Sequence, residues 1–143
     1  MYFVNEEQIG SRLAFLQRLA ETARELAVRW QDGDAVLALA QERALHLAIE
    51  GVTDVGSLLI DAFILRDASS YEDIVDILRG EGAFDPDTAG QLLDLVKLRR
   101  PLVQDYTSWD ASGLHALTLR LPELLPRFVE QVRAFMAKEL GGS

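Results

Sequence analysis

The feature that most constrains the fold is a helical repeat of apolar residues near the N-terminus. Between Asn5 and Gln31 the spacing of these residues alternates between four and three. The positions are Ile9, Leu13, Leu16, Ala20, Ala23, Ala27 and Trp30. This spacing lines them up along one side of an α-helix, so the pattern predicts a helix from about Asn5 to Gln31 with one buried face. Asn5 is a suitable N-cap residue, and Asp32-Gly33-Asp34 interrupts the pattern.

A second periodic segment follows almost at once. Its inward positions are Leu45, Ala48, Val52, Val55, Leu59 and Ala62. The pattern continues to about Leu65, which makes this helix longer than an average globular helix. Two long helices that are joined by a short turn lie antiparallel, so the sequence predicts the first pair of a helical bundle.

Two shorter helices are predicted next. Ser70-Tyr71-Glu72-Asp73 resembles a capping box with aspartate in its last place, and Gly80 is placed to end the helix that it opens. Asp85-Pro86 combines an N-cap residue with a proline at the first helical position. The helix that begins there is predicted to carry Arg99 at its C-terminal end.

A last helix completes the pattern. Asp110 is predicted to cap it, and Pro122 and Pro126 are predicted to bend or break it. Its inward positions are Leu114, Leu117, Leu121, Leu124, Phe128, Val132 and Phe135. No segment shows the alternation of a β-strand. The sequence therefore predicts an all-α fold, an antiparallel bundle of four to five helices, in a single domain over residues 1–143.

Composition excludes several classes of protein. The chain has no cysteine, which rules out disulfides, thiolate zinc sites and a catalytic thiol. Its net charge is −9, from 23 acidic and 14 basic residues, and this disfavours broad binding to nucleic acid. The basic residues gather in one place, at Lys97, Arg99 and Arg100. An anion is therefore expected at one site rather than along a whole surface.

The sequence also argues against a membrane segment. The most apolar stretch, residues 45–65, carries Glu50, Asp54 and Asp61, and each carboxylate is unfavourable in hydrocarbon. The N-terminus lacks the basic start and the apolar run of a signal peptide. We therefore expect a cytoplasmic protein with no membrane contact.

Arg99, Gln104 and Tyr106 lie in the segment that points most directly to chemistry. Pro101 has no N–H for the carbonyl of Lys97, so the helix is expected to kink or restart between Arg99 and Gln104. On a straight α-helix, residues five apart point about 140° away from each other, whereas a kink lets both face one cleft. A bland alternative is that the arginine caps helix carbonyls and the tyrosine is an ordinary half-buried aromatic.

A narrow polar stripe is predicted on the second helix. It contains Arg43, Glu50, Asp54 and Asp61, and the last three point within about 20° of the direction of Arg43. An ordinary solvated face explains such a stripe. The functional alternative is that the stripe lines a cleft, in which Glu50 or Asp54 pairs with Arg99 and holds it in place.

Two histidines are the only side chains that titrate near neutral pH. His46 lies about 60° from the polar stripe and is a candidate proton carrier, although a histidine at the edge of the core is the more common arrangement. His115 has no second type of metal ligand near it in the sequence. We predict no metal site and no cofactor.

Three segments together resemble the HepT-like branch of the HEPN domains, and the match covers most of the chain in order. The segments are residues 42–56, residues 70–74 and residues 99–106. The signature of that family is an arginine, four residues, a histidine, one residue and a tyrosine. Arg99 and Tyr106 match it, but Gln104 occupies the place of the histidine.

This resemblance implies a homodimer with a cleft where the signature segments of two copies meet. Family members that are paired with a minimal nucleotidyltransferase antitoxin act as toxins and cut RNA without metal. The arginine steadies the scissile phosphate and the histidine takes part in proton transfer. The antitoxin attaches nucleotides to the signature tyrosine, which corresponds to Tyr106.

Gln104 can form hydrogen bonds but cannot carry a proton near neutral pH. Three hypotheses follow. The first is a weak metal-independent endoribonuclease with Arg99, Gln104 and Tyr106 in its site, supported by Arg43, Glu50 and Asp54. The second is a non-catalytic module that binds a nucleotide or a partner protein. The third is a protein whose Tyr106 accepts a nucleotidyl group.

Overall fold

Five α-helices make up most of the chain, and the part that the computed structural model describes, residues 2–141, contains no strand. The helices are α1 (Glu6–Arg29), α2 (Ala35–Ala62), α3 (Tyr71–Gly80), α4 (Pro86–Lys97) and α5 (Ala116–Gly141). A π-helical segment, η1 (Arg100–Gln104), and a 3₁₀ turn, η2 (Tyr106–Ser108), lie between α4 and α5. The predicted all-α bundle is confirmed. No helix of residues 2–141 is long and apolar enough to cross a membrane.

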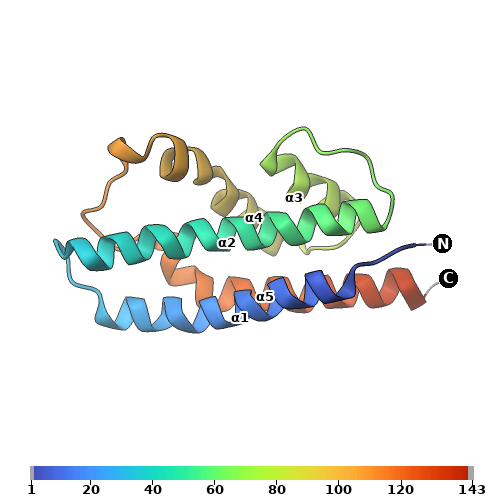
Figure 1. Cartoon of the computed structure of the whole chain (residues 1–143), viewed down its shortest axis with the longest axis horizontal. Helices are drawn as coiled ribbons and strands as arrows, with labels where there is room; N and C mark the ends of the chain where they lie inside the picture. Colours follow the sequence, from blue (N-terminus) through green and yellow to red (C-terminus); the bar gives the residue numbers. More distant parts are fainter. Residues whose placement is uncertain (1, 142–143) are drawn as a thin grey trace.

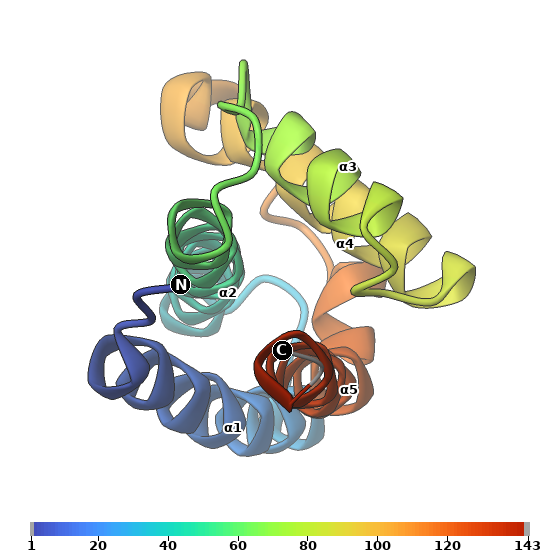
Figure 2. The same cartoon turned by 90° about the vertical axis from the view of Figure 1, so that its right-hand side faces the viewer.

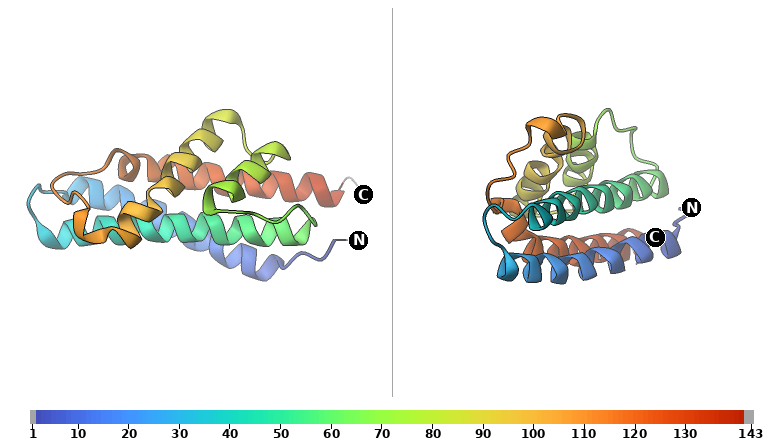
Figure 3. Two further views of the ribbon diagram at one scale, coloured as in Figure 1. Left: turned by 90° about the horizontal axis from the view of Figure 1, so that it is seen from above. Right: turned by 60° about the vertical axis from the view of Figure 1, so that its left-hand side comes forward.

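The helices are arranged in two layers about α2. α1 and α5 lie side by side below α2, and α3 and α4 lie above it (Figure 1). The end-on view in Figure 2 shows α1, α2 and α5 as a triangle, with the α3–α4 pair lying along the side between α2 and α5 and contacting both. From above, α3 and α4 run obliquely across α2 (Figure 3). The central helix therefore contacts both layers.

Burial on α2 extends over two faces. The predicted inward positions of this helix are all buried, as expected. Ile49, Gly56 and Ile60 are buried as well, because α3 and α4 cover a second side of the helix. Full burial of a Leu or Ile side chain stabilises a fold by roughly 1.5–3 kcal/mol, so both buried faces of α2 contribute to stability. Only a narrow strip of α2 remains for charged residues.

The predicted N-caps are found where the sequence places them. The side chain of Asn5 accepts a hydrogen bond from the backbone N–H of Gln8 at 3.1 Å, and that of Asp85 accepts one from Thr88 at 2.7 Å. Ser70 Oγ accepts from the N–H of Asp73 at 3.0 Å. Each cap satisfies a helix N–H that would otherwise have no partner.

The start of α5 differs from the prediction. Asp110 does not cap this helix but accepts a hydrogen bond from the N–H of Ser112 at 3.0 Å, which closes a local turn. α5 begins at Ala116, and His115 takes the capping role by accepting from the N–H of Leu117 through Nδ1 at 3.0 Å.

The delayed start of α5 has a tertiary cause. The amide of Gln41, which is fully buried in α2, donates to the carbonyl of Gly113 at 3.1 Å and accepts from the N–H of His115 at 2.7 Å. The same amide oxygen accepts from Thr118 Oγ1 at 2.8 Å. These bonds fix the chain before Ala116 in a non-helical path.

The prolines of α5 do not break it. The helix runs without interruption through Pro122 and Pro126. Leu121, Leu124 and Phe128 surround them in sequence and are buried against the other helices. Packing of this face outweighs the hydrogen bonds that the two prolines cannot donate.

Close packing at Gly56 gives a first prediction. A Cβ atom at this position would collide with Ile74 of α3 and contact Leu78, so Gly56→Ala should overpack the α2–α3 interface. We expect a loss of about 1–3 kcal/mol in the free energy of unfolding, measured by urea denaturation. The control is Gly10→Ala, since no atom lies within 4 Å of that added Cβ. Higher helix propensity should make this control more stable by about 1 kcal/mol, and equal effects of the two substitutions would contradict the prediction.

Candidate functional site

The signature segment begins where α4 stops being a regular α-helix. Pro101 cannot donate a hydrogen bond to Lys97, and the chain continues as the π-helical segment η1. The N–H of Asp105 donates to the carbonyl of Arg100 at 3.0 Å, which closes a ring that is one residue wider than that of an α-helix. This wider turn reduces the angle between residues five apart. The predicted restart at Pro101 is confirmed.

Arg99 lies at the junction of α4 and η1 and faces α2. Its Nε donates to Glu50 Oε1 at 3.4 Å, and its side chain is only 24% exposed. The guanidinium carbon lies 4.1 Å from the centre of the Tyr71 ring, in a cation–π contact. Its two terminal nitrogens donate to no residue of the described chain. Arg99 is therefore held on two sides and retains the N–H groups that a phosphate or carboxylate would use.

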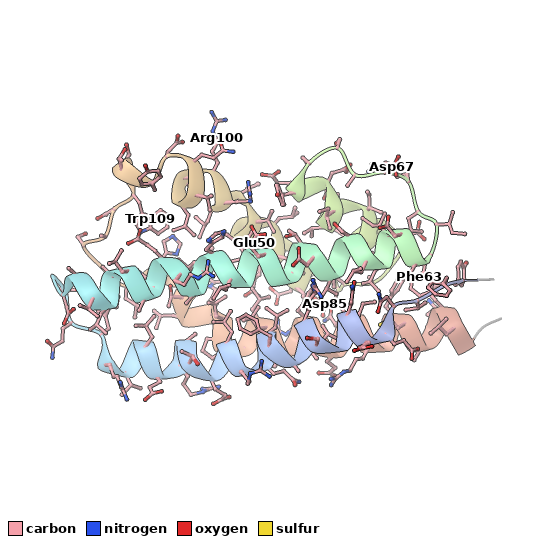
Figure 4. The ribbon with its side chains drawn as sticks, viewed as in Figure 1. Glu50, Phe63, Asp67, Asp85, Arg100 and Trp109 are labelled. Carbon is pink, nitrogen blue, oxygen red and sulfur yellow. The ribbon has the colours of Figure 1, made fainter. Side chains whose placement is uncertain are left out.

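Figure 4 shows how different the two neighbouring arginines are. Glu50 lies on α2 below the junction, whereas the side chain of Arg100 extends upward, away from α2. Arg100 is 80% exposed and its nearest charged group is Asp105, at 3.8 Å. It is an ordinary surface arginine, and only Arg99 is built into the protein.

Tyr71 was not identified as a site residue from the sequence. It is the first residue of α3, directly after the Ser70 cap. Its ring reaches Arg99 because α3 and α4 pack together. The capping-box pattern predicted where α3 begins. Nothing in the sequence around Tyr71 indicates that its ring contacts Arg99, which lies far along the chain.

A strong ion pair anchors the loop that leads to Tyr71. Arg66 binds both carboxylate oxygens of Asp73 at 2.7 Å. The Asp73 carboxylate also accepts a hydrogen bond from the backbone N–H of Ser69 at 2.9 Å. In a regular capping box the acceptor would bind the N–H of Ser70, so here the bond is shifted by one residue into the loop. These hydrogen bonds, from Arg66 first and Ser69 second, hold the pKa of Asp73 well below its usual range.

The polar stripe of α2 is divided in the structure. Glu50 Oε1 lies 3.4 Å from Arg99 Nε and also 3.4 Å from His46 Nε2, so one carboxylate joins both side chains. Arg43 Nη1 lies 3.4 Å from His46 Nδ1. Asp54 lies outside this cluster and pairs with Arg12 of α1 at 3.4 Å. Of the two acids considered for Arg99, the structure selects Glu50.

A shallow groove of about 360 Å³ adjoins the cluster. Its lining combines residues of α2, η1 and η2: Leu39, Glu42, Arg43, His46, Leu102, Val103 and Tyr106. Tyr106 is 65% exposed, and its hydroxyl has no hydrogen-bond partner within residues 2–141. Gln104 is also exposed, and its side-chain amide forms no hydrogen bond within residues 2–141. It does not line the groove. The groove brings together Arg43, His46 and Tyr106 rather than Gln104 and Tyr106.

The second histidine is used structurally. His115 stacks on Trp109, with ring centres 5.8 Å apart, and caps α5. Burial lowers its pKa, which keeps it neutral and able to accept the Leu117 N–H. Across residues 2–141, no group of three or more His, Cys, Asp or Glu side chains is placed to hold a metal ion.

These features define a class of helical protein, in which a helix broken by proline places a paired arginine, Arg99, beside a cluster of polar residues that adjoins a groove. Comparisons then identify the family. The profile of the ribonuclease HepT-like family matches residues 12–132. The chain belongs to this family, as the resemblance of its sequence indicated.

Two comparisons with one relative, in sequence and in structure, extend this result. The protein named "Putative RNase YutE" from Bacillus subtilis (strain 168) is 35% identical over 141 residues, which is 99% of this chain and 96% of that protein. A solved structure of Bacillus subtilis YutE, described as a cytosolic protein of unknown function, superposes with a TM-score of 0.86 at 33% identity. It covers 99% of this chain and 96% of its own.

The Arg66–Asp73 pair gives a prediction on pH. We expect Asp73→Asn to lower the free energy of unfolding at neutral pH, and we expect the difference from wild type to shrink in acid. Because the pKa of Asp73 is depressed by folding, its contribution is fully present above the unfolded pKa of about 4 and is lost as the pH falls through the folded value. Urea denaturation at a series of pH values measures this.

The matched control is Asp76→Asn in the same helix. Asp76 pairs with Arg79 at 2.9 Å on an exposed surface, where such a pair contributes little. A pH-dependent loss of the same size in this variant would contradict a special role for Asp73.

Proposed function

We propose that this protein is a slow, metal-independent RNA endonuclease of the toxin–antitoxin type, active in the cytosol as a homodimer. Membership of the ribonuclease HepT-like family and the printed name of the YutE relative support the general activity. The observation that carries the proposal is the arrangement of Arg99. A guanidinium that is fixed by Glu50 and Tyr71, with its terminal N–H groups free, is prepared to bind a phosphate.

The proposed reaction is cleavage by the RNA itself. The ribose 2′-oxygen attacks the adjacent phosphorus, the bond to the 5′-oxygen breaks, and the products are a 2′,3′-cyclic phosphate and a 5′-hydroxyl. Negative charge grows on the non-bridging oxygens during this step, and Arg99 stabilises it. A pre-positioned donor of this kind accelerates such reactions by roughly 10²- to 10³-fold.

Gln104 limits the proposed rate. General acid–base catalysis contributes roughly 10²- to 10⁴-fold, and an amide cannot supply it. Gln104 can only donate or accept hydrogen bonds near the substrate. We therefore expect the signature segment by itself to support turnover well below that of a family member with histidine at this position.

Exposed apolar residues support pairing of two copies. Val36 and Leu39 lie on the outer surface of α2 and are 76% and 66% exposed, and Leu39 also lines the groove with Tyr106. Apolar side chains that gather on one exposed face are characteristic of an interface. In the proposed dimer, this face of each copy meets its counterpart and the two signature segments share one cleft.

Removal of Arg99 tests the proposal. We expect Arg99→Ala to reduce kcat/KM on a fluorescent single-stranded RNA by at least about 10²-fold, because the phosphate loses its fixed donor. Initial rates are measured in EDTA, and sedimentation establishes the association state of each protein. The control is Arg100→Ala, which removes an equal charge from an exposed position and should change the rate little.

Two outcomes contradict the ribonuclease. Equal cleavage by wild type and Arg99→Ala would indicate a contaminating nuclease. If wild type leaves the RNA intact, the protein is a non-catalytic binding module instead. The non-ionisable Gln104 favours that candidate. Thermal stabilisation by a mono- or dinucleotide, lost in Arg99→Ala, would then support that module.

Tyr106 supports a second candidate, that the protein is a substrate of a minimal nucleotidyltransferase partner. Its hydroxyl is exposed and has no hydrogen-bond partner in the described chain, as an acceptor requires. Co-expression with such an enzyme should add one or more nucleoside monophosphates to the intact mass. Tyr106→Phe should abolish the addition, whereas Tyr71→Phe, which alters a tyrosine covered by Arg99, should retain it. Addition to both variants would exclude Tyr106 as the acceptor.

A further inference from the structure

The signature segment has no histidine, but the cluster next to it contains one, His46. His46 shares an oxygen of Glu50 with Arg99, and both nitrogens lie 3.4 Å from that oxygen. The His46 and Arg99 nitrogens are therefore at most twice this distance apart. A phosphate bound to the free end of Arg99 would lie in the neighbourhood of the imidazole.

The contacts of His46 define its protonation. A guanidinium can only donate hydrogen bonds, so His46 Nδ1, which faces Arg43, is the acceptor. The other ring nitrogen, Nε2, then carries the hydrogen and lies 3.4 Å from Glu50 Oε1, in a charge contact. A carboxylate on one ring nitrogen and a lone pair on the other is the arrangement that orients a histidine to act as a base.

His46 is also accessible. Its side chain is 29% exposed and lines the groove together with Tyr106 of η2 and Val103 of η1. Arg43 is exposed, so its contact with Nδ1 can be exchanged for a phosphate. This exchange would free the lone pair on the groove side.

The charges around His46 come from two directions. On α2, Glu42, Arg43 and Glu50 face it, and Arg99 approaches through Glu50 from the end of α4. The acids and the guanidinium groups balance in number. The surroundings of the imidazole therefore carry no excess of positive charge that would oppose its protonation.

We propose that His46 is a catalytic residue of this chain and supplies the proton transfer that Gln104 cannot. The inference rests on the proposed ribonuclease. His46 Nδ1 removes the proton from the 2′-hydroxyl as the 2′-oxygen bonds to phosphorus. The bond to the 5′-oxygen breaks, and that oxygen takes a proton from water while the imidazolium returns its proton to solvent. Atoms and charge balance, and no other reactant is needed.

The test combines two substitutions. We expect His46→Gln to lower kcat by about 10²- to 10⁴-fold with a small change in KM, since substrate binding rests on arginine. In a Gln104→His background, where the signature regains a proton carrier, the same His46→Gln change should have a much smaller effect. Thermal unfolding of each variant checks that the fold is retained.

Two further readouts separate catalysis from structure. The pH–rate profile of wild type should show a decrease towards acid that His46→Gln lacks, because a general base acts only in its unprotonated form. The cleaved ends should be a 2′,3′-cyclic phosphate and a 5′-hydroxyl.

The outcomes distinguish the two proposals. If Arg99→Ala is inactive but His46→Gln cleaves at the wild-type rate with the wild-type pH profile, the ribonuclease stands and the role of His46 is wrong. If Arg99→Ala cleaves like wild type, the ribonuclease itself is wrong. If wild type is inactive and only Gln104→His cleaves, His46 does not replace the signature histidine.

Discussion

Burial of α2 on two faces is the constraint on which the rest of the structure depends. α1 and α5 cover one side of this helix and α3 and α4 cover another, so its polar positions are confined to a strip between the two layers. A carboxylate on that strip lies close to the upper layer and is energetically unfavourable without a partner. Glu50 is such a residue, and the partner that reaches it is Arg99. Arg99, the arginine of the proposed site, is therefore also part of the contact between the layers.

The end of α4 makes this pairing compatible with an open site. On a regular α-helix through residues 99–104, the side chains of Arg99 and Gln104 would point about 140° away from each other. Pro101 prevents that continuation, and η1 replaces it with a wider turn whose apolar residue Leu102 is buried against α2. Arg99 can then face Glu50 while Tyr106 and Val103 remain at the groove. Departures from α-helical bonding of this kind are frequent at functional sites.

The sequence predicted the features that depend on local patterns. Apolar periodicity placed the five helices, and the caps Asn5, Ser70 and Asp85 were identified because an N-cap acts over only three residues. It did not predict the start of α5, because the amide that holds the preceding chain belongs to Gln41 of α2. The wrong choice of Asp110 as a cap thus reflects a tertiary contact that overrides a local preference.

The candidate site was predictable to the same extent. The helical angle put Arg43, Glu50 and Asp54 on one stripe, but it could not show that Arg12 of α1 takes Asp54 and leaves Glu50 for Arg99. Nor could it place Tyr71 against Arg99, because that contact depends on how α3 packs on α4.

Charge distribution argues for a particular kind of substrate. A net charge of −9 repels a polyanion at long range, but at physiological salt this field is screened beyond about 8 Å. Close to Arg99, a bound phosphate meets a guanidinium whose partner acid, Glu50, is already shared with His46. Attraction is thus short-ranged and centred on one phosphate. A long duplex would place many further phosphates against an acidic surface, whereas a short single-stranded segment would place few. For the proposed ribonuclease, this charge distribution favours a flexible, single-stranded RNA over a rigid duplex.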